Sequence, residues 1–479
     1  MGVPYVRLPV DSLNVPWNVF QPFPWSVIDR LPFEWVSYPD FVRFSRRGWH
    51  FADGSDTHVR LGPVWALVTP VAIFCRRNAF IRPIKEYELL EVFGPCISVA
   101  GWDDWARHRK VLAAPFNENV MEYVWAESLR QARGLLRSWL SAGDAGIPSF
   151  SKDTRTLSLN VLASSAFRKS YEFRGSADDH VEETGSYRDS LQTVLDNIIP
   201  LMIIPHRFLN GPFVPKRWAR IGNAGASFQK HMQGKSGSGG LMTSFVHALN
   251  THAREGDSPG TKSNITKWGL TENEIYGNLF VINFAGHDTT ANTLAFTMVL
   301  LAAHPEVQEW IAEEILAVTE GIPSEQWIYK DLFPVLKRCR AILLETLRCF
   351  PPVLAIPKWV RDSAETLRVG DRTLTIPPGT NTTIYVRAVQ SHPDYWPDPH
   401  TWKPTRWILN PASSKEDIIN EELLVPKQDT FLPWSDGPQN CLGKKSSEVE
   451  ATAVLACLFA HNRIHVKKTA KESDKAAKE

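Results

Sequence analysis

The longest apolar segment of the chain runs from Thr271 to His304. Thr271 is followed three residues later by Glu274, which is the capping-box pattern of a helix start. Asn283 and Asp288 lie in the middle of the segment and interrupt an apolarity that otherwise resembles a membrane span. The pattern predicts a long helix in the centre of a large protein, next to something polar.

Further helices and a few strands are predicted on both sides of this segment. Apolar residues with helical spacing predict helices at Trp102–Asn117, Glu122–Ser141, Lys152–Arg168, Pro305–Val318, Asp331–Arg348 and Lys444–Ala460. Short runs of strand-forming residues predict strands at His58–Thr69, Leu367–Ile376 and Thr382–Val386. The sequence therefore predicts a mainly α protein with a small β region.

The stretch from Leu191 to Phe213 is strongly apolar but broken by prolines. Buried core is one interpretation, and a mobile mouth that touches a membrane is the other. The sequence alone leaves both open.

Charge and cysteine content exclude several classes of protein. The 53 Lys and Arg residues nearly balance the 52 Asp and Glu residues, so the net charge of +1 gives no support for a nucleic-acid partner. Six cysteines are too few for a disulfide framework, and they form no zinc-ligand spacing. The expected partners are apolar molecules or other proteins, and the expected compartment is reducing.

Cys441 is the main candidate for chemistry, in the loop FLPWSDGPQNCLG from Phe431 to Gly443. A thiolate is a strong ligand for iron, and backbone N–H groups at a helix start stabilise its negative charge. Gly437 and Gly443 suit a tight turn and a close approach of a flat cofactor to the backbone. An ordinary buried thiol is the alternative for a lone cysteine.

The predicted long helix contains the sequence AGHDTT, which places Asp288 and Thr289 on the same face as Ala285. Gly286 thins the helix where a planar group or a gas molecule could lie. An acid beside a hydroxyl can relay protons there. A local kink whose polar groups satisfy each other is the alternative.

Glu345 and Arg348 are three residues apart in a predicted helix with apolar flanks. A solvated ion pair is the simple interpretation. The flanks favour burial instead, and a buried arginine needs further partners. Arg406 is the candidate third member of a Glu–Arg–Arg network.

Trp105 and Arg109 lie four residues apart on one predicted helix. Together they could present an indole N–H and a guanidinium to one carboxylate or propionate, and a cation–π pair is the alternative. Lys358 could add a second cation to the same anion.

In this order along the chain, these motifs resemble the cytochrome P450 family of heme-thiolate monooxygenases, from about Arg60 to Ala460. The resemblance implies that Cys441 is the axial ligand of the iron in heme b, iron protoporphyrin IX. It implies that Glu345, Arg348 and Arg406 form a buried network that supports the cysteine region.

The same resemblance assigns the other candidate residues. Asp288 and Thr289 are expected to manage protons at the oxygen, and Trp105, Arg109 and Lys358 to hold the heme propionates. The loop residues assigned to cofactor binding are Trp434, Gly437, Cys441 and Gly443.

Three positions depart from the family pattern. Trp434 stands where Phe is common and still covers the sulfur, and Trp407 similarly replaces Phe. Gln439 replaces the Arg that usually meets a propionate, so that contact loses its charge. The sequence PWSDGPQNC around Trp434 resembles that of filamentous-fungal members of the family that oxidise secondary metabolites.

The resemblance also implies an organisation and a function. It implies a single catalytic domain over residues 51–465, preceded by a Pro- and Trp-rich segment at 1–50 that faces a surface or membrane and followed by a charged, disordered tail at 466–479. The expected reaction inserts one atom of O2 into a lipophilic terpenoid, polyketide or alkaloid. Segments expected to line the pocket are Phe93–Gly101, Leu191–Phe213, Phe280–Phe284 and Val353–Ile356.

NADPH-cytochrome P450 reductase is the expected electron donor, since the sequence contains no flavin or nicotinamide domain. The family implies the cytoplasmic face of the endoplasmic reticulum. The first residues show no anchor helix, which leaves peripheral membrane contact and a cytoplasmic location open.

Two other functions stay open. One is an isomerase or dehydratase of the same fold that needs no reductase, and the other is a non-catalytic heme-binding protein from a shortened gene.

Overall fold

The computed structural model describes residues 73, 76, 78–176, 186–211, 214–233, 269–369, 372–414 and 417–467. The predicted strands at His58–Thr69, the segment 1–50 and the tail beyond residue 467 lie outside these ranges. The chain divides into two compact units. Unit 1 comprises Met1–Arg82, Val353–Thr401 and Pro426–Gln439, and unit 2 comprises Pro83–Pro352, Trp402–Val425 and Asn440–Glu479.

Unit 2 is built from helices. They are α7 (Ile84–Tyr87), α8 (Trp102–Ala113), α9 (Glu118–Ser141), α10 (Phe150–Phe167), α11 (Tyr187–Asp196), α12 (Ile198–Ile203), α13 (Lys216–Gln233), α15 (Glu272–Ala303), α16 (Pro305–Thr319), α17 (Tyr329–Leu332), α18 (Lys337–Cys349) and α20 (Lys444–Phe459). Short 3-10 turns include η3 (His206–Asn210), η4 (Ser324–Gln326) and η5 (Pro404–Trp407). Strands β6 (Ile408–Leu409) and β7 (Glu422–Leu423) form a small antiparallel pair.

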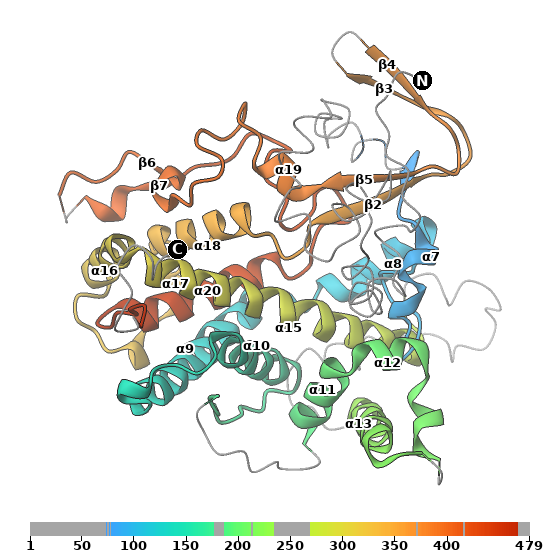
Figure 1. Cartoon of the computed structure of the whole chain (residues 1–479), viewed down its shortest axis with the longest axis horizontal. Coiled ribbons are helices and arrows are strands. Elements are labelled where there is room, and N and C mark those ends of the chain that lie inside the picture. Colours follow the sequence, from blue (N-terminus) through green and yellow to red (C-terminus); the bar gives the residue numbers. More distant parts are fainter. Residues whose placement is uncertain are drawn as a thin grey trace, which may run out of the picture. The chain divides into compact units, whose positions relative to one another are not determined.

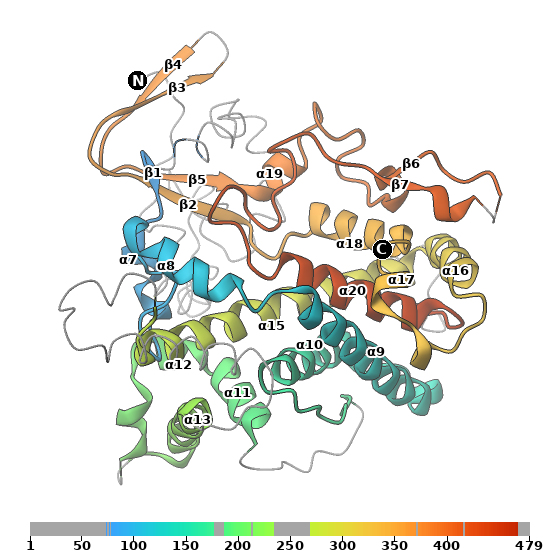
Figure 2. The same cartoon turned by 180° about the vertical axis from the view of Figure 1, so that it is seen from behind.

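Helix α15 begins as the sequence predicts. The Thr271 hydroxyl accepts the Glu274 N–H at 3.3 Å, and the Thr271 N–H donates to Glu274 Oε2 at 2.6 Å, which completes the capping box. Helix α10 packs against α15, and α18 and α20 contact it as well (Figure 1). Seen from behind, α9 lies against α20 and α10 (Figure 2). The prediction of a long helix in the centre of a helical protein is confirmed.

Two predicted helix boundaries are wrong for local reasons. Helix α8 ends at Ala113 because Asn117 is the N-cap of α9, where its side chain accepts the Val120 N–H at 3.2 Å. The helix predicted at Asp331–Arg348 is two helices, α17 and α18. Pro334 lies between them and cannot donate a helical hydrogen bond.

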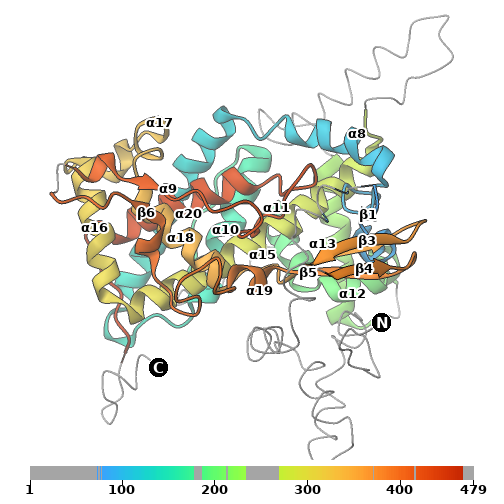
Figure 3. The same ribbon diagram turned by 90° about the horizontal axis from the view of Figure 1, so that it is seen from above.

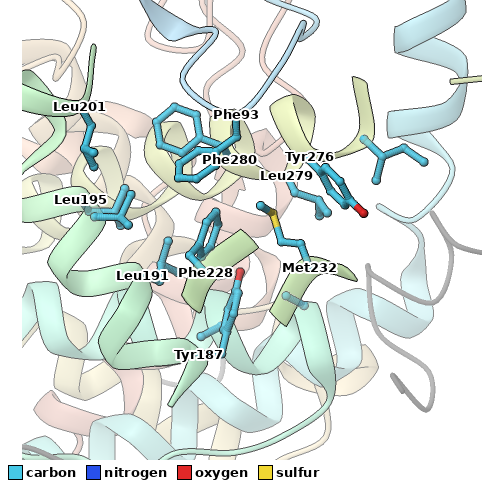
Figure 4. Close-up of a cluster of buried hydrophobic side chains, with 14 of the residues drawn as sticks. Phe93, Tyr187, Leu191, Leu195, Leu201, Phe228, Met232, Tyr276, Leu279 and Phe280 are labelled. Atoms are coloured by element: carbon cyan, nitrogen blue, oxygen red, sulfur yellow. The ribbon is translucent and has the colours of Figure 1, made fainter. Parts of the chain in front are cut away.

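A large hydrophobic cluster fills the region around α11, α13 and the first half of α15 (Figure 4). The labelled members of this cluster are Phe93, Tyr187, Leu191, Leu195, Leu201, Phe228, Met232, Tyr276, Leu279 and Phe280. Phe93 packs at 5.1 Å from Phe228 and at 5.3 Å from Phe280, measured between ring centroids. The elements that follow α10 are therefore held to α15 by apolar packing.

The proline-broken stretch from Leu191 has two faces. Leu191 and Leu201 are buried in the cluster, whereas Ile199, Ile203 and Phe208 are exposed by 43%, 60% and 61%. The buried-core interpretation therefore holds for one face only. Among the described helices, none is both long and apolar enough to cross a membrane.

Unit 1 contains the other described strands. An antiparallel sheet has the order β1 (Phe80–Ile81), β2 (Ala355–Val360), β5 (Asn381–Tyr385), and helix α19 (Val386–Gln390) follows β5. Strands β3 (Glu365–Val369) and β4 (Arg372–Ile376) form an antiparallel pair, seen side by side in Figure 3. The single strand predicted at Leu367–Ile376 is thus wrong, because two residues, Gly370 and Asp371, separate paired strands.

Candidate functional site

Cys441 lies just ahead of helix α20, whose N-cap is Gly443. Cys441 is exposed to solvent. The protein atoms packed around the sulfur nevertheless raise the pKa of the thiol, whereas the backbone N–H groups of Gly443 and Lys444 and the charge of Arg109 lower it. The sulfur therefore sits among donors and a cation that stabilise a thiolate.

Gly443 itself does not need glycine for its backbone, since its φ is −83°. A Cβ at this position would lie 3.8 Å from Cys441 Sγ, which is ordinary van der Waals contact. A methyl group at this position would therefore touch the sulfur without a clash.

Arg109 extends from α8 to the residue that precedes the cysteine. Its Nη1 donates to the Asn440 carbonyl oxygen and its Nη2 to Asn440 Oδ1, both at 2.6 Å. Burial lowers the pKa of Arg109, and the thiol of Cys441 acts in the opposite direction. Arg109 thus fixes the backbone next to Cys441 and supplies a positive charge there. Sequence reasoning missed Asn440, because nothing in the spacing marks an amide as a partner for Arg109.

Trp105 lies one turn before Arg109 but points elsewhere. Its ring stacks on Trp102 at 5.4 Å with an interplanar angle of 7°. The cation–π pairs found among described residues do not include Trp105 with Arg109. The two side chains therefore have separate contacts.

The structure brings Glu345, Arg348 and Arg406 together in unit 2. Glu345 and Arg348 are both 0% exposed. Arg348 Nε and Nη2 donate to the two oxygens of Glu345 at 2.8 and 2.9 Å, and Arg406 Nε donates to Oε1 at 3.0 Å. A buried carboxylate with several charged donors is stable where an isolated one would not be.

Two more donors complete the Glu345 network. The Lys403 N–H donates to Oε1 and the Trp407 indole N–H donates to Oε2, each at 2.8 Å. The sequence carried a signal for Trp407, since tryptophan in place of phenylalanine adds a donor. The backbone contact of Lys403 had no such signal.

Asp288 and Thr289 lie on α15. Arg155 Nε of α10 is 3.1 Å from Asp288 Oδ1, and the Thr289 hydroxyl donates to the Ala285 carbonyl oxygen at 2.8 Å. The sequence suggested that Gly286 thins the helix where a planar group or a gas molecule could lie. In the structure, Gly286 does not face an open space. A Cβ there would lie 3.6 Å from the Leu162 methyl groups of α10, so Gly286 faces that helix.

The remaining candidate residues belong to unit 1. Lys358 is buried on β2, and burial together with the charge of Arg82 lowers its pKa to about 8. Gly437 has a φ of +70°, which favours glycine, and its N–H donates to Asp436 Oδ1 at 2.7 Å. Trp434 packs edge to face on Phe431.

The same loop region of unit 1 contains a buried acid, Asp429, which is 7% exposed. Neither of its side-chain oxygens has a hydrogen-bond partner within the described ranges. Burial, together with Asp436, raises its pKa to about 6. An acid whose folded pKa is raised stabilises the fold at low pH and loses that contribution as the pH rises from about 4 through 6.

We therefore expect Asp429→Asn to be more stable than the wild type above pH 6, by on the order of 2 kcal/mol, because the variant buries no charge. The advantage should shrink toward pH 4. Urea unfolding at several pH values measures it. A difference that stays constant between pH 4 and 7 would contradict the buried ionisation of Asp429.

The donor set fits an iron porphyrin. An exposed cysteine sulfur flanked by two N–H donors and an arginine suits a single anionic ligand to iron. Arg109 and Trp105 lie on α8, and the guanidinium of Arg109 acts on this same sulfur. The residues present are thus compatible with a heme held through Cys441.

A helical fold with a cysteine at the start of a late helix and a buried Glu–Arg–Arg network defines a heme-thiolate protein. Residues 92–478 match the family described as Cytochrome P450, and the chain belongs to this family. The match covers the greater part of the chain and includes every candidate residue named above.

Several similar proteins come from fungi. A cytochrome P450 monooxygenase of Arthrobotrys oligospora is 27% identical over 97% of this chain and 86% of that protein, and one of Postia placenta is 30% identical over 82% and 74%. The phomenoic acid biosynthesis cluster cytochrome P450 monooxygenase of Leptosphaeria maculans is 28% identical over 97% and 87%.

The crystal structure of the cytochrome P450DA heme domain superposes with a TM-score of 0.61 at 18% identity, over 82% of this chain and 79% of that one. The fold is therefore that of a cytochrome P450. The relatives named above are cytochrome P450 monooxygenases of fungi, and one of them is named for a biosynthesis cluster.

Proposed function

We propose that the protein uses heme b to insert one oxygen atom of O2 into a lipophilic small molecule in secondary-metabolite biosynthesis. The observation that carries this proposal is Cys441, an exposed thiol beside two N–H donors and Arg109. When bound, heme supplies the iron chemistry that activates O2 toward a C–H bond. Cys441 would provide the ligand for the heme iron, and the names of the relatives support the reaction class.

The protein's own residues have distinct roles in this proposal. Cys441 would hold the iron as a thiolate, and Arg109 keeps the adjacent Asn440 in place while offering a cation. Trp105, Lys358, Trp434, Gly437 and Gly443 are proposed to contact the cofactor. The network of Glu345, Arg348 and Arg406 is proposed to support the region around the cysteine.

Asp288 and Thr289 are proposed to hold and move protons beside the cofactor. The Thr289 hydroxyl donates to Ala285, so its oxygen keeps lone pairs that can accept a proton. Asp288, the residue before Thr289, forms an ion pair with Arg155 of α10, which restrains the position of its carboxyl group. Both groups are suited to general acid–base work.

A terpenoid, polyketide or alkaloid substrate fits the apolar composition of the segments expected to line the pocket. The hydrophobic cluster of Figure 4 includes members of the segments expected to line the pocket, at Phe93, Leu191 and Phe280. The relative from Leptosphaeria maculans is named for a phomenoic acid cluster. These observations support an oxidation step on a lipophilic metabolite.

NADPH-cytochrome P450 reductase is the proposed electron donor, and the cytoplasmic face of the endoplasmic reticulum is the proposed location. The exposed side chains of Ile199, Ile203 and Phe208 support peripheral contact with a membrane.

Oxygen labelling separates this function from its two rivals. The holoprotein is supplied with reductase, NADPH and extracts of a producing strain that lacks the gene, under ¹⁸O2. Label in a new product supports a monooxygenase. Conversion that needs neither NADPH nor O2 would indicate an isomerase or dehydratase, and no conversion with a heme-loaded protein would favour a heme-binding role.

We expect Arg109→Ala to retain less heme than the wild type, because Asn440 loses two hydrogen bonds and the sulfur loses its nearby cation. Heme content per protein after gel filtration measures the loss. Lys110→Ala is the matched control, since it removes an exposed cation from the same helix. Equal heme content in the two variants would show that Arg109 has no such role.

A further inference from the structure

One histidine and two carboxylates from two helices of unit 2 meet at the start of α15. Asp104 and His108 lie one turn apart on α8, and Glu274 lies in the first turn of α15. Asp104 Oδ2 and Glu274 Oε1 each lie 3.4 Å from His108 Nε2. One ligand atom from each of the three residues lies within 4.8 Å of the other two. These side chains have no role in the proposed heme site.

The spacing of this cluster suits a shared ion better than direct hydrogen bonds. An N–H···O hydrogen bond spans about 2.7–3.2 Å, and both contacts of His108 Nε2 are longer than that. Two ligands that bind zinc at about 2.0–2.1 Å and at a tetrahedral angle are about 3.3–3.4 Å apart. His108 Nε2 therefore lies at the distance from both carboxylates that a zinc ion between them would set.

Burial and access also suit a bound ion. His108 is only 1% exposed, whereas the side chain of Asp104 is 48% exposed. The cluster thus has a fixed ligand on one side and a route to solvent on the other.

Arg107 restrains both carboxylates and leaves room for a cation. Its Nε donates to Asp104 Oδ1 at 2.8 Å, its Nη1 donates to Glu274 Oε2 at 3.0 Å, and its Nη2 donates to Glu274 Oε1. A carboxylate oxygen has two lone pairs, so Oε1 can accept this hydrogen bond and also bind an ion. One guanidinium balances only one of the two carboxylates, so a negative charge remains for a cation.

We propose that Asp104 Oδ2, His108 Nε2 and Glu274 Oε1 bind a zinc ion, with water from the open side as the fourth ligand. An imidazole nitrogen with two carboxylate oxygens is a ligand set that zinc accepts, whereas calcium and magnesium prefer oxygen ligands. The bound ion joins α8 to the first turn of α15. The proposal is independent of the proposed function.

Asn278 of α15 sets the tautomer of His108. Asn278 Oδ1 accepts the Ile97 N–H at 2.8 Å, and its Nδ2 donates to the Glu274 carbonyl oxygen at 2.6 Å. The amide is thereby oriented, and Nδ2 is the atom that lies 3.0 Å from His108 Nδ1. Nδ1 therefore accepts a hydrogen bond, and the hydrogen of the neutral ring is on Nε2.

This tautomer opposes the ion and keeps its affinity modest. Zinc needs the lone pair of His108 Nε2, so the ring hydrogen has to move to Nδ1, where it meets the amide N–H of Asn278. Two donors cannot face each other, so the Asn278 amide has to turn. Ile97 then loses the acceptor of its N–H.

Asn278→Asp should bind zinc about ten-fold more tightly than the wild type, because an aspartate accepts both the Ile97 N–H and a hydrogen on His108 Nδ1. A carboxylate is the usual partner of a histidine that binds zinc. Zinc should also speed hydrogen exchange at the Ile97 amide in the wild type but not in Asn278→Asp. Unchanged exchange at Ile97 in zinc-bound wild type would overturn the coupling through Asn278.

Calorimetric titration of the holoprotein, free of any histidine tag, with zinc chloride measures the affinity. Heme-loaded protein is used so that Cys441 is not available to zinc. Asp104→Asn should weaken binding about ten-fold or more, because it removes a charged ligand at an exposed position. Glu272→Gln is the matched control, since it replaces an exposed acid at the start of α15 that is not part of the cluster, and it should match the wild type.

Two results would overturn the site. One is equal zinc affinity in the wild type, Asp104→Asn and Asn278→Asp, which would place the ion elsewhere on the protein. The other is the absence of zinc binding in both the wild type and Asn278→Asp. The urea midpoint of each variant shows whether it folds, and Asp104→Asn decides the question if Asn278→Asp does not fold.

Discussion

Cys441→Ala is expected to abolish the thiolate-type Soret band that the reduced wild-type protein gives with carbon monoxide. The reason is that the sulfur beside Gly443 and Lys444 is the proposed ligand, and alanine offers no donor to iron. The absorption spectrum of the dithionite-reduced protein under carbon monoxide measures the change.

Cys457→Ala provides the matched control, because Cys457 is a buried thiol on α20, the helix that Cys441 precedes. Burial raises its pKa to about 11, so it is a packing residue and not a ligand. The control should keep the band. A band that persists in Cys441→Ala would remove this residue as the ligand and with it the central part of the proposed function.

Glu345→Ala is expected to have the second largest effect, a loss of folding stability. The substitution leaves Arg348 fully buried without its charge partner, which costs about 3–5 kcal/mol. Since a domain is stable by only about 5–15 kcal/mol, the substitution should remove a large part of the free energy of unfolding. Soluble yield and the urea midpoint measure the loss.

Trp407→Phe gives a graded comparison within the same network. It removes a single hydrogen bond to Glu345 and should cost about 1.5–3 kcal/mol, with the protein still folded. Equal effects of the two substitutions would contradict the central position of Glu345.

Much of the site could be predicted because its residues carry local signals. Glu345 and Arg348 are three residues apart on one helix, and Cys441 precedes a helix start, so spacing alone brought out both features. Their partners lie far away in the chain. Asn440 meets Arg109 across 331 residues, and no pattern in either segment announces that contact.

In the fold, too, features with a local sequence signal were predicted, whereas features set by distant parts of the chain were missed. The capping box at Thr271 marked the start of α15, since the cap and its partner are three residues apart. Strand β2 was missed because it contains Pro357 and is defined by its neighbours β1 and β5. Pro334 was a local signal that the prediction of one helix at Asp331–Arg348 ignored.

The Glu345 network also constrains the order in which the chain folds. Its donors at Lys403, Arg406 and Trp407 follow the carboxylate by 58, 61 and 62 residues. Until synthesis passes Trp407, the side chains of Glu345 and Arg348 on α18 can pair with each other but not yet with the donors at Lys403, Arg406 and Trp407. Closing a loop of this length costs entropy before any of the distant hydrogen bonds form. We therefore expect residues of α18 to gain protection from hydrogen exchange late in folding, together with the segment at Lys403–Trp407.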